Sequence, residues 1–339
     1  MKIKTGNLAY FLSRSLFLGG GISLLFLNAN KDAYIAIILG SLLGIGIIYL
    51  ISLVSKKVNQ PLNEYLKEKS ILNISIRIIF IIYIIFLIFI LLIILATFLY
   101  SYFLIFTPSI ISCLPFVFLA TYLNSKSIKN ISLIAGVLLV LSLVLVFLKT
   151  ILLANEFDFS NIMPILTVKP SNLFITALIF SVLSTAPFLT IIDEQTTFKE
   201  NIKYYLISML TIFIVVLTIT VVLGEMVNIY SYPEYSVLRK ISLFNFIENI
   251  ENFVSAGWFF DIFISLSVCS LKLKNLINVK SSLVAFIISV IILYIINIFI
   301  ANNFYNSMAI YKVFPIILAV FMAILLILFM LKKSKKKDG

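Results

Sequence analysis

Long apolar runs alternate with short polar segments along almost the whole chain. Most of these runs reach the roughly 20 residues that a helix needs to cross about 30 Å of hydrocarbon. They predict ten membrane spans, near residues 7–28, 33–55, 71–106, 109–123, 129–154, 172–193, 202–224, 241–272, 281–300 and 309–331. The remaining segments are too short for a water-soluble domain. We therefore expect a single transmembrane domain over residues 1–331, embedded in the lipid bilayer, and a basic tail over residues 332–339.

Charged residues indicate how the spans are oriented. Lysines, Lys272 among them, gather in every second predicted loop or at its border with a span, and in the tail, and this asymmetry predicts that the N-terminus and the C-terminus are both cytoplasmic. The net charge of +12 is concentrated in these loops and the tail, so we do not expect nucleic acid as a partner. The chain has no histidine, and both cysteines lie in apolar runs. Neither a metal site nor a cofactor is therefore expected.

The first span carries three consecutive glycines at its centre, Gly19, Gly20 and Gly21. Glycine weakens a helix, and irregular backbone at membrane depth is tolerated only where it is buried in protein or lines a cavity. A half-helix that begins near Gly21 and Ile22 directs its N–H groups toward an anion such as an amino-acid carboxylate. We therefore predict ligand binding by the three glycines, Ile22 and Ser23. The alternative is that the glycines only allow close helix packing.

The sixth span is interrupted at the corresponding place. The first span begins near Asn7 and the sixth near Asn172, 165 residues later. The same offset places Ser184, Thr185 and Ala186, followed directly by a proline, opposite the glycines, and we predict these three as further ligand-binding residues. The pattern predicts an all-α integral membrane protein of ten helices in a five-plus-five inverted repeat. Its halves cover about residues 7–154 and 172–331, and helices one and six are broken and meet at the membrane midplane.

The eighth predicted span carries a polar stripe. Steps of three or four residues separate its members, which are Glu248, Glu251, Ser255, Trp258, Asp261 and Ser265. This spacing puts them on one helix face, and the face must point into the bundle because a charge facing lipid costs at least about 2.5 kcal/mol. We take Trp258 as a ligand-binding residue, and Glu248, Glu251, Asp261 and Ser265 as coupling or ion-pair candidates. Two simpler explanations remain open: Asp261 as a neutral contact between helices, and the two glutamates as a solvated helix start.

Several segments resemble a known family. Two interrupted spans in such a repeat look like the amino acid–polyamine–organocation transporter fold. A narrower resemblance to the endospore germination permeases, the B-type subunits of nutrient germinant receptors, is carried by GGGISLLFLNANKDAYIAIILGSLLG (19–44), KKVNQPLNEYLKE (56–68), DFSNIMPIL (158–166), YPEY (232–235) and IENIENFVSAGW (247–258).

This resemblance implies a receptor subunit of the spore inner membrane that binds a small nutrient, such as an amino acid, at the membrane midplane and signals germination. It also implies two partners, an A-type membrane subunit and a C-type lipoprotein. A proton-coupled amino-acid transporter of the same fold is the alternative function. An enzyme is not expected, because the intramembrane carboxylates come without a nucleophile and base pair.

Arg14 lies seven residues into the first predicted span and cannot lose its proton to escape burial. In the transporter fold that the chain resembles, spans one and eight pack together, which suggests a pair between Arg14 and Asp261. Snorkelling of Arg14 to the membrane interface is the alternative. We expect Asp193 and Glu194 to form a solvated cap at the end of span six, and Lys149 to lie at the interface.

Overall fold

The computed structural model describes residues 5–18, 20–58, 60–68, 70–105, 107–124, 126–194, 196–241, 250–279, 281–302 and 304–332. No strand occurs in these residues. Eight of the helical segments within them are long and apolar enough to cross a membrane, and α6 (Ser109–Asn124) is a shorter apolar helix. The chain is an all-α, multi-pass membrane protein, as the hydropathy pattern predicts.

The helices follow the predicted spans closely, and the 3₁₀ helices among them are labelled η. The first span consists of α1 (Gly6–Arg14), η1 (Ser15–Phe17) and α2 (Gly20–Ala29), and the sixth of α8 (Pro170–Thr185) and η5 (Ala186–Ile191). The other spans are α3 (Ala33–Val58), α5 (Ile71–Tyr102), α6, α7 (Ile128–Leu152), α9 (Phe198–Leu223), α11 (Ile250–Ile277), α12 (Leu283–Asn302) and α13 (Phe304–Leu331). The short connecting elements are η2 (Asn30–Asp32), α4 (Leu62–Tyr65), η3 (Ala154–Glu156), η4 (Phe159–Ile162), η6 (Gly224–Ile229) and α10 (Pro233–Leu238).

The eighth span differs from the prediction at both ends. Ile241 is not helical, residues 242–249 lie outside the described part, and α11 continues to Ile277 instead of ending near residue 272. The predicted end was wrong because Lys272 was read as part of a solvated loop, whereas its side chain is buried and paired inside the bundle.

Both interruptions fall where the sequence predicts them. After α1 and η1 the backbone of Leu18 is extended, with φ −69° and ψ 137°, and α2 starts two residues later. In the sixth span the α-helix ends at Thr185 and the chain continues as the 3₁₀ helix η5. Pro187 lies at the start of η5 and has no N–H group to continue the α-helical ladder.

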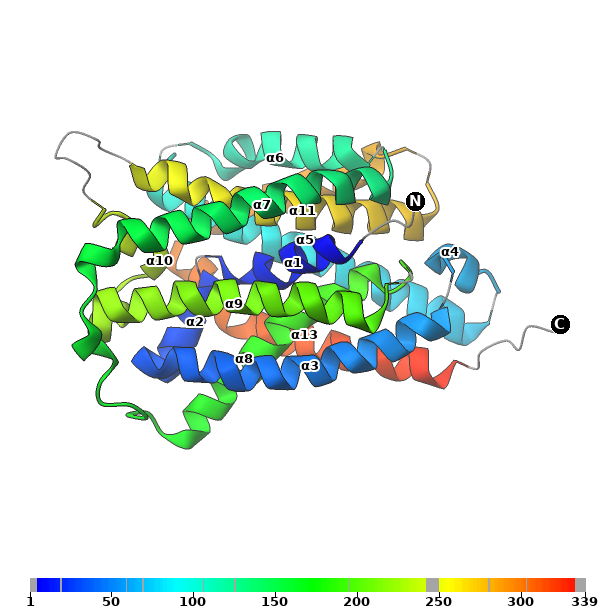
Figure 1. Ribbon diagram of the computed structural model, residues 1–339. Helices are drawn as coiled ribbons and strands as arrows, with labels where there is room; N and C mark the ends of the chain where they lie inside the picture. Colours follow the sequence, from blue (N-terminus) through cyan, green and yellow to red (C-terminus); the bar gives the residue numbers. More distant parts are fainter. Residues whose placement is uncertain are drawn as a thin grey trace.

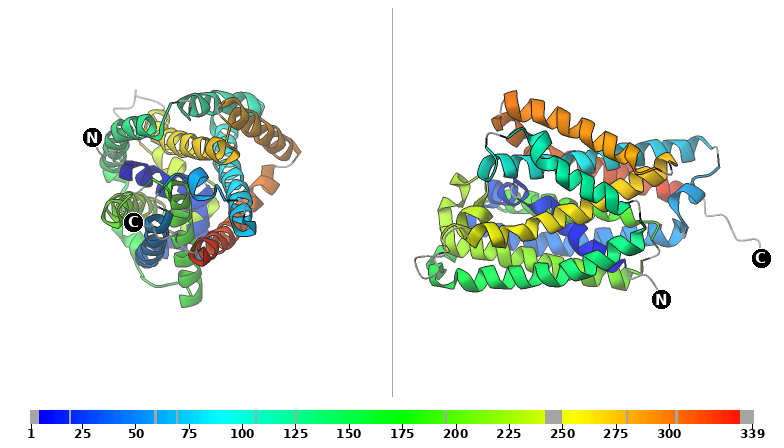
Figure 2. Two further views of the ribbon diagram at one scale, coloured as in Figure 1. Left: turned by 90° about the vertical axis from the view of Figure 1, so that its right-hand side faces the viewer. Right: turned by 90° about the horizontal axis from the view of Figure 1, so that it is seen from above.

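Helix α1 lies inside the bundle, whereas α8 starts at the outer surface beside α3 and leads inward to the buried η5 (Figures 1 and 2). Helix α3 packs along α8, and α1 packs along α9. In the same way α13 packs on α5, and α11 packs on α7. In a five-plus-five inverted repeat, each contact between two spans has a counterpart between the spans five positions away. The contact of spans two and six matches that of seven and one, and the contact of spans three and ten matches that of eight and five, so this packing agrees with such a repeat. The repeat and the count of ten crossings remain predictions.

The bundle has two distinct ends (Figure 1). One carries η3, η4, η6 and α10, and we call it the lid end. The other carries α4, the start of α1 and the end of α13, and we call it the terminal end. Under the predicted topology the lid end faces outward and the terminal end faces the cytoplasm.

A buried carboxylate organises the lid end. Asp32, fully buried in η2, accepts hydrogen bonds from the backbone N–H groups of Leu166, Thr167 and Val168 at 2.7–3.2 Å. The neighbouring Lys31 donates to the carbonyl of Met163 at 2.8 Å. A buried carboxylate is stable only when such donors surround it, so these bonds fix the long loop against the end of the first span.

Candidate functional site

The glycines at the first break occupy places that no larger residue fits. A Cβ on Gly21 would lie 1.9 Å from the carbonyl oxygen of Leu16, and a Cβ on Gly20 would lie 2.7 Å from the ring of Tyr311. The N–H of Gly21 donates to the carbonyl of Leu18 at 3.2 Å, so the protein itself satisfies this group. Gly19 lies outside the described residues. The glycines thus allow close approach of backbone and of an aromatic ring, which is the packing role that the sequence left open.

A cavity of about 260 Å³ opens near this break at the lid end, between α2, η6 with the segment that follows it, and α13. We call it the lid pocket. Gly20 and Ser23 line it on one side, and Ser231, Tyr311 and Lys312 lie on the others. Ser23 also donates a hydrogen bond from its hydroxyl to the carbonyl of Ser231. Two residues predicted from the glycine motif therefore border a cavity of suitable size for a small molecule.

The break in the sixth span is sealed by protein. Ser184, Thr185 and Ala186 are fully buried, and both hydroxyls donate to the carbonyl of Ser181, at 3.1 and 2.6 Å. The carbonyl of Ala186 accepts a hydrogen bond from the hydroxyl of Tyr83 on α5. None of the three predicted residues lines the lid pocket. The structure therefore does not bring them together with Gly20 and Ser23 around one cavity.

A buried ion pair joins the first span to α11. Arg14 Nη2 lies 3.5 Å from Asp261 Oδ2, and both side chains are almost fully buried. Arg14 Nη1 also donates to Ser142 Oγ at 2.7 Å and to the hydroxyl of Tyr10. Neither carboxylate oxygen of Asp261, nor the hydroxyl of Ser265 one turn further along, has a hydrogen-bond partner among the described residues. Arg14 is therefore paired inside the bundle and does not extend to its surface.

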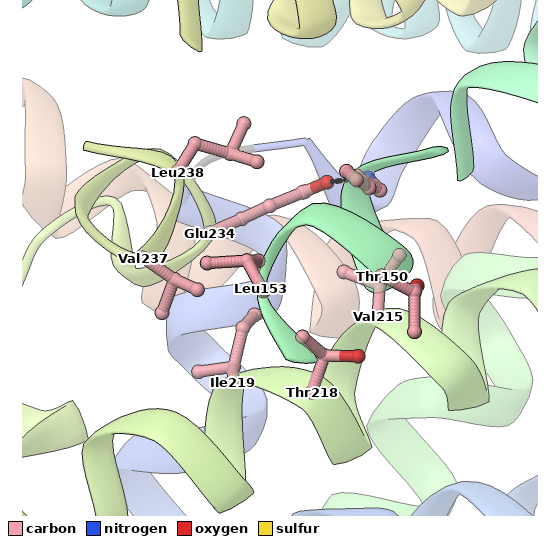
Figure 3. A pocket seen from close by; sticks show the side chains of 9 residues that line it. Thr150, Leu153, Val215, Thr218, Ile219, Glu234, Val237 and Leu238 are labelled. Atoms are coloured by element: carbon pink, nitrogen blue, oxygen red, sulfur yellow. Dashed lines mark hydrogen bonds and ion pairs between the residues drawn. The ribbon is translucent and has the colours of Figure 1, made fainter. Parts of the chain in front are cut away.

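A second buried pair was missed by the sequence analysis. Lys149 on α7, expected at the interface, is instead buried and forms an ion pair with Glu234 on α10. The indole N–H of Trp258 donates to the same carboxylate at 3.0 Å. Figure 3 shows the Glu234 side chain directed from α10 toward its ion-pair partner on α7, with a dashed line for the contact. The only sequence signal was the position of Glu234 within the YPEY motif.

Two small cavities flank Glu234. One lies between α7, α9 and α10 and includes Thr150 and Val215 in its lining (Figure 3). The other lies between Glu234 and Arg14, with Ile22 in its lining. Each has a volume of about 10 Å³, close to the space that one water molecule needs. Arg14 and Glu234, one member of each ion pair, thus line the same cavity, which is about the size of one water molecule.

Aromatic residues hold the lid helix α10 against the bundle. Tyr232 and Tyr235 are buried and pack on Phe98 and Tyr102 of α5, and Phe98 lies edge-on to Trp258 with ring centroids 4.7 Å apart. Burial raises the pKa of Tyr232 well above its usual value, so its hydroxyl stays neutral. Trp258, predicted as a ligand-binding residue, thus contacts the lid helix and does not line the lid pocket. Glu248 and the side chain of Glu251 lie outside the described part.

The long loop between α7 and α8 has an exposed carboxylate for comparison. The hydroxyl and the backbone N–H of Ser160 donate to Asp158 and lower the pKa of its carboxyl. In the described part of the chain, no three histidine, cysteine, aspartate or glutamate side chains form a group able to hold a metal ion.

These features together define a class of protein. A multi-pass helical bundle with two interrupted spans, buried charges beside the breaks and a cavity at one end is the architecture of a membrane permease. A family model described as spore germination protein matches residues 9–305. The chain belongs to this family, which is transporter- or receptor-like and acts in nutrient sensing. No curated protein matches the chain.

Proposed function

We propose that this protein is the permease-like B-type subunit of a spore germinant receptor, which binds a small nutrient and signals germination. The lid pocket carries the proposal, because it reaches from the lid end to Gly20 at the break of the first span. Lys312 supplies a positive charge in its lining, and Ser23 and Ser231 supply polar groups. This lining suits a small molecule that carries an anionic group. We therefore infer that the nutrient is an amino acid.

The same proposal places the protein in its cellular setting. The nutrient enters at the lid end, both termini are cytoplasmic, and the membrane is the spore inner membrane. An A-type membrane subunit and a C-type lipoprotein are the partners. Purification of the tagged chain from spores tests this arrangement. A large membrane subunit and a lipoprotein should accompany it, and recovery of the chain alone contradicts the assignment.

Binding is tested on purified protein in lipid nanodiscs. A ligand that binds only the folded state raises the melting temperature. Each of the 20 amino acids is therefore added separately at millimolar concentration, and the melting temperature is measured. We expect a saturable increase with one amino acid or a few of similar shape. No shift with any of them contradicts an amino-acid site.

A proton-coupled amino-acid transporter is the second candidate function. It is favoured by the buried pair of Arg14 and Asp261, since buried carboxylates mark proton and ion pathways in membrane proteins. Proteoliposomes separate the two functions. A transporter accumulates the amino acid identified by melting temperature when a pH gradient is imposed, whereas a receptor subunit binds it without accumulation.

A further inference from the structure

A buried lysine and two partly buried carboxylates meet at the terminal end of the bundle. Lys272 Nζ on α11 lies 2.5 Å from Asp193 Oδ1 and also contacts the carboxylate of Glu194. The side chain of Lys272 is 3% exposed, that of Asp193 8% and that of Glu194 18%. Asp193 and Glu194, expected as a solvated cap, are thus bound to a lysine inside the structure. This cluster lies apart from the lid pocket and the pairs around Glu234.

The short helix α4 is tied to the same place. The N–H of Leu62 donates to Asp193 Oδ2 at 3.2 Å, and the amide of Asn63 donates to the carbonyl of Asn275 on α11. At its other end, the carbonyl of Tyr65 accepts from Lys332 at the end of α13, whose ammonium also lies 3.6 Å from the Tyr65 ring centroid. Helix α4 therefore connects the sixth, eighth and tenth spans across the terminal end.

A direct covalent path runs from the cluster to the break in the sixth span. Asp193 follows η5 by two residues, and η5 begins at Ala186, whose carbonyl accepts from Tyr83. On α11, Cys269 lies one turn before Lys272 and is 1% exposed. Any movement that separates Lys272 from Asp193 therefore also acts on the break and on the surroundings of Cys269.

The chemistry of this contact suits a reversible closure. Buried ion pairs contribute little net stability, because the loss of hydration offsets their attraction. Opening returns the charges to water, so it costs less than opening an apolar contact of similar size. We propose that Lys272, Asp193 and Glu194, with α4, form a latch that keeps the terminal end closed while the lid pocket is open. Resting on the proposed function, we infer that the nutrient signal reaches the terminal end by releasing this latch.

The two native cysteines provide the test. Purified full-length protein is treated with N-ethylmaleimide in the absence of any amino acid, and mass spectrometry follows the alkylation of Cys269 and Cys113 separately. Cys113 is also fully buried, but it lies near the start of α6. Release of the latch exposes Cys269 alone, whereas general unfolding exposes both thiols.

We expect Lys272→Met to speed the alkylation of Cys269 by at least about tenfold, because it removes the charge-assisted hydrogen bonds to both Asp193 and Glu194, and the loss of one such bond already shifts an opening equilibrium by about that factor. Asp193→Asn should act in the same direction, and it leaves Lys272 paired with Glu194, so no buried charge loses its partner. Lys272→Arg should restore slow alkylation. Lys274→Met is the matched control, because it removes a lysine two residues away whose one hydrogen bond among the described residues goes to the backbone carbonyl of Asn124.

Wild-type alkylation rates in both Lys272→Met and Asp193→Asn overturn the latch, as does equal acceleration by Lys274→Met. If Lys272→Met does not fold, Asp193→Asn decides the question alone. Because no amino acid is present, failure of this experiment is distinct from failure of nutrient binding.

Discussion

Removing one member of the pair between Arg14 and Asp261 leaves the other charge buried in the centre of the bundle. At the observed N–O distance of 3.5 Å, the attraction amounts to about 5 kcal/mol for an effective dielectric constant of about 20. Breaking a buried pair from one side costs about 3–5 kcal/mol. We expect Asp261→Asn and Arg14→Gln each to destabilise the protein by that amount. After Asp261→Asn, Arg14 keeps Ser142 and Tyr10 as neutral partners, which do not compensate its charge.

The double variant Arg14→Gln with Asp261→Asn removes both charges together. It should recover much of the loss, with a coupling of at least about 2 kcal/mol between the two sites. The assay is the apparent melting temperature in detergent, measured at one heating rate for wild type, both single variants and the double variant. Asp158→Asn, at a fully exposed carboxylate, serves as the control and should change little. Additive losses, with the double variant as damaged as the two singles combined, would refute a buried pair.

Two further predictions concern local structure. Asp32→Ala leaves the backbone N–H groups of residues 166–168 without their acceptor, so it should destabilise the protein by about 1–3 kcal/mol and speed proteolysis of the long loop between α7 and α8. The exposed Glu156→Ala in the same loop should do neither, and equal effects would contradict the role of Asp32. Gly21→Ala places a methyl group against a backbone carbonyl and should cost about 1–3 kcal/mol, whereas Gly46→Ala enters open space and should be neutral or stabilise by up to about 1 kcal/mol. Equal melting temperatures of these two variants would show that the break does not require glycine.

The sequence predicts those features that depend on residues close together along the chain. Hydropathy locates the helices, and small residues with a proline locate both breaks, because each reflects how one segment meets lipid or forms backbone hydrogen bonds. Helical spacing puts Asp261 on the polar face of its span. The partner of each charge is harder to predict. Lys149 and Glu234 are 85 residues apart, and each lies next to a loop, where a charged residue is also compatible with exposure to solvent.

Lysine position was misleading for the same reason. A lysine near a span end fits both a cytoplasmic loop and a buried pair, and the local sequence does not distinguish them. Lys272 was therefore assigned to a loop, although its partners, Asp193 and Glu194, come from another span. The lid pocket also depends on three segments that meet only in the folded bundle, so the glycine motif predicts two of its residues but not its other walls.

Equilibrium dialysis tests the central claim, nutrient binding at the break of the first span, most directly. Wild-type protein, Gly20→Leu and Gly46→Leu are compared with the radiolabelled amino acid that raises the melting temperature. A Cβ added at Gly20 lies 2.7 Å from the ring of Tyr311 beside the lid pocket, whereas a Cβ added at Gly46 has no neighbouring atom within 4 Å. The account predicts saturable binding by wild type and Gly46→Leu, and its loss in a folded, membrane-inserted Gly20→Leu protein. Binding by Gly20→Leu with wild-type affinity would contradict it.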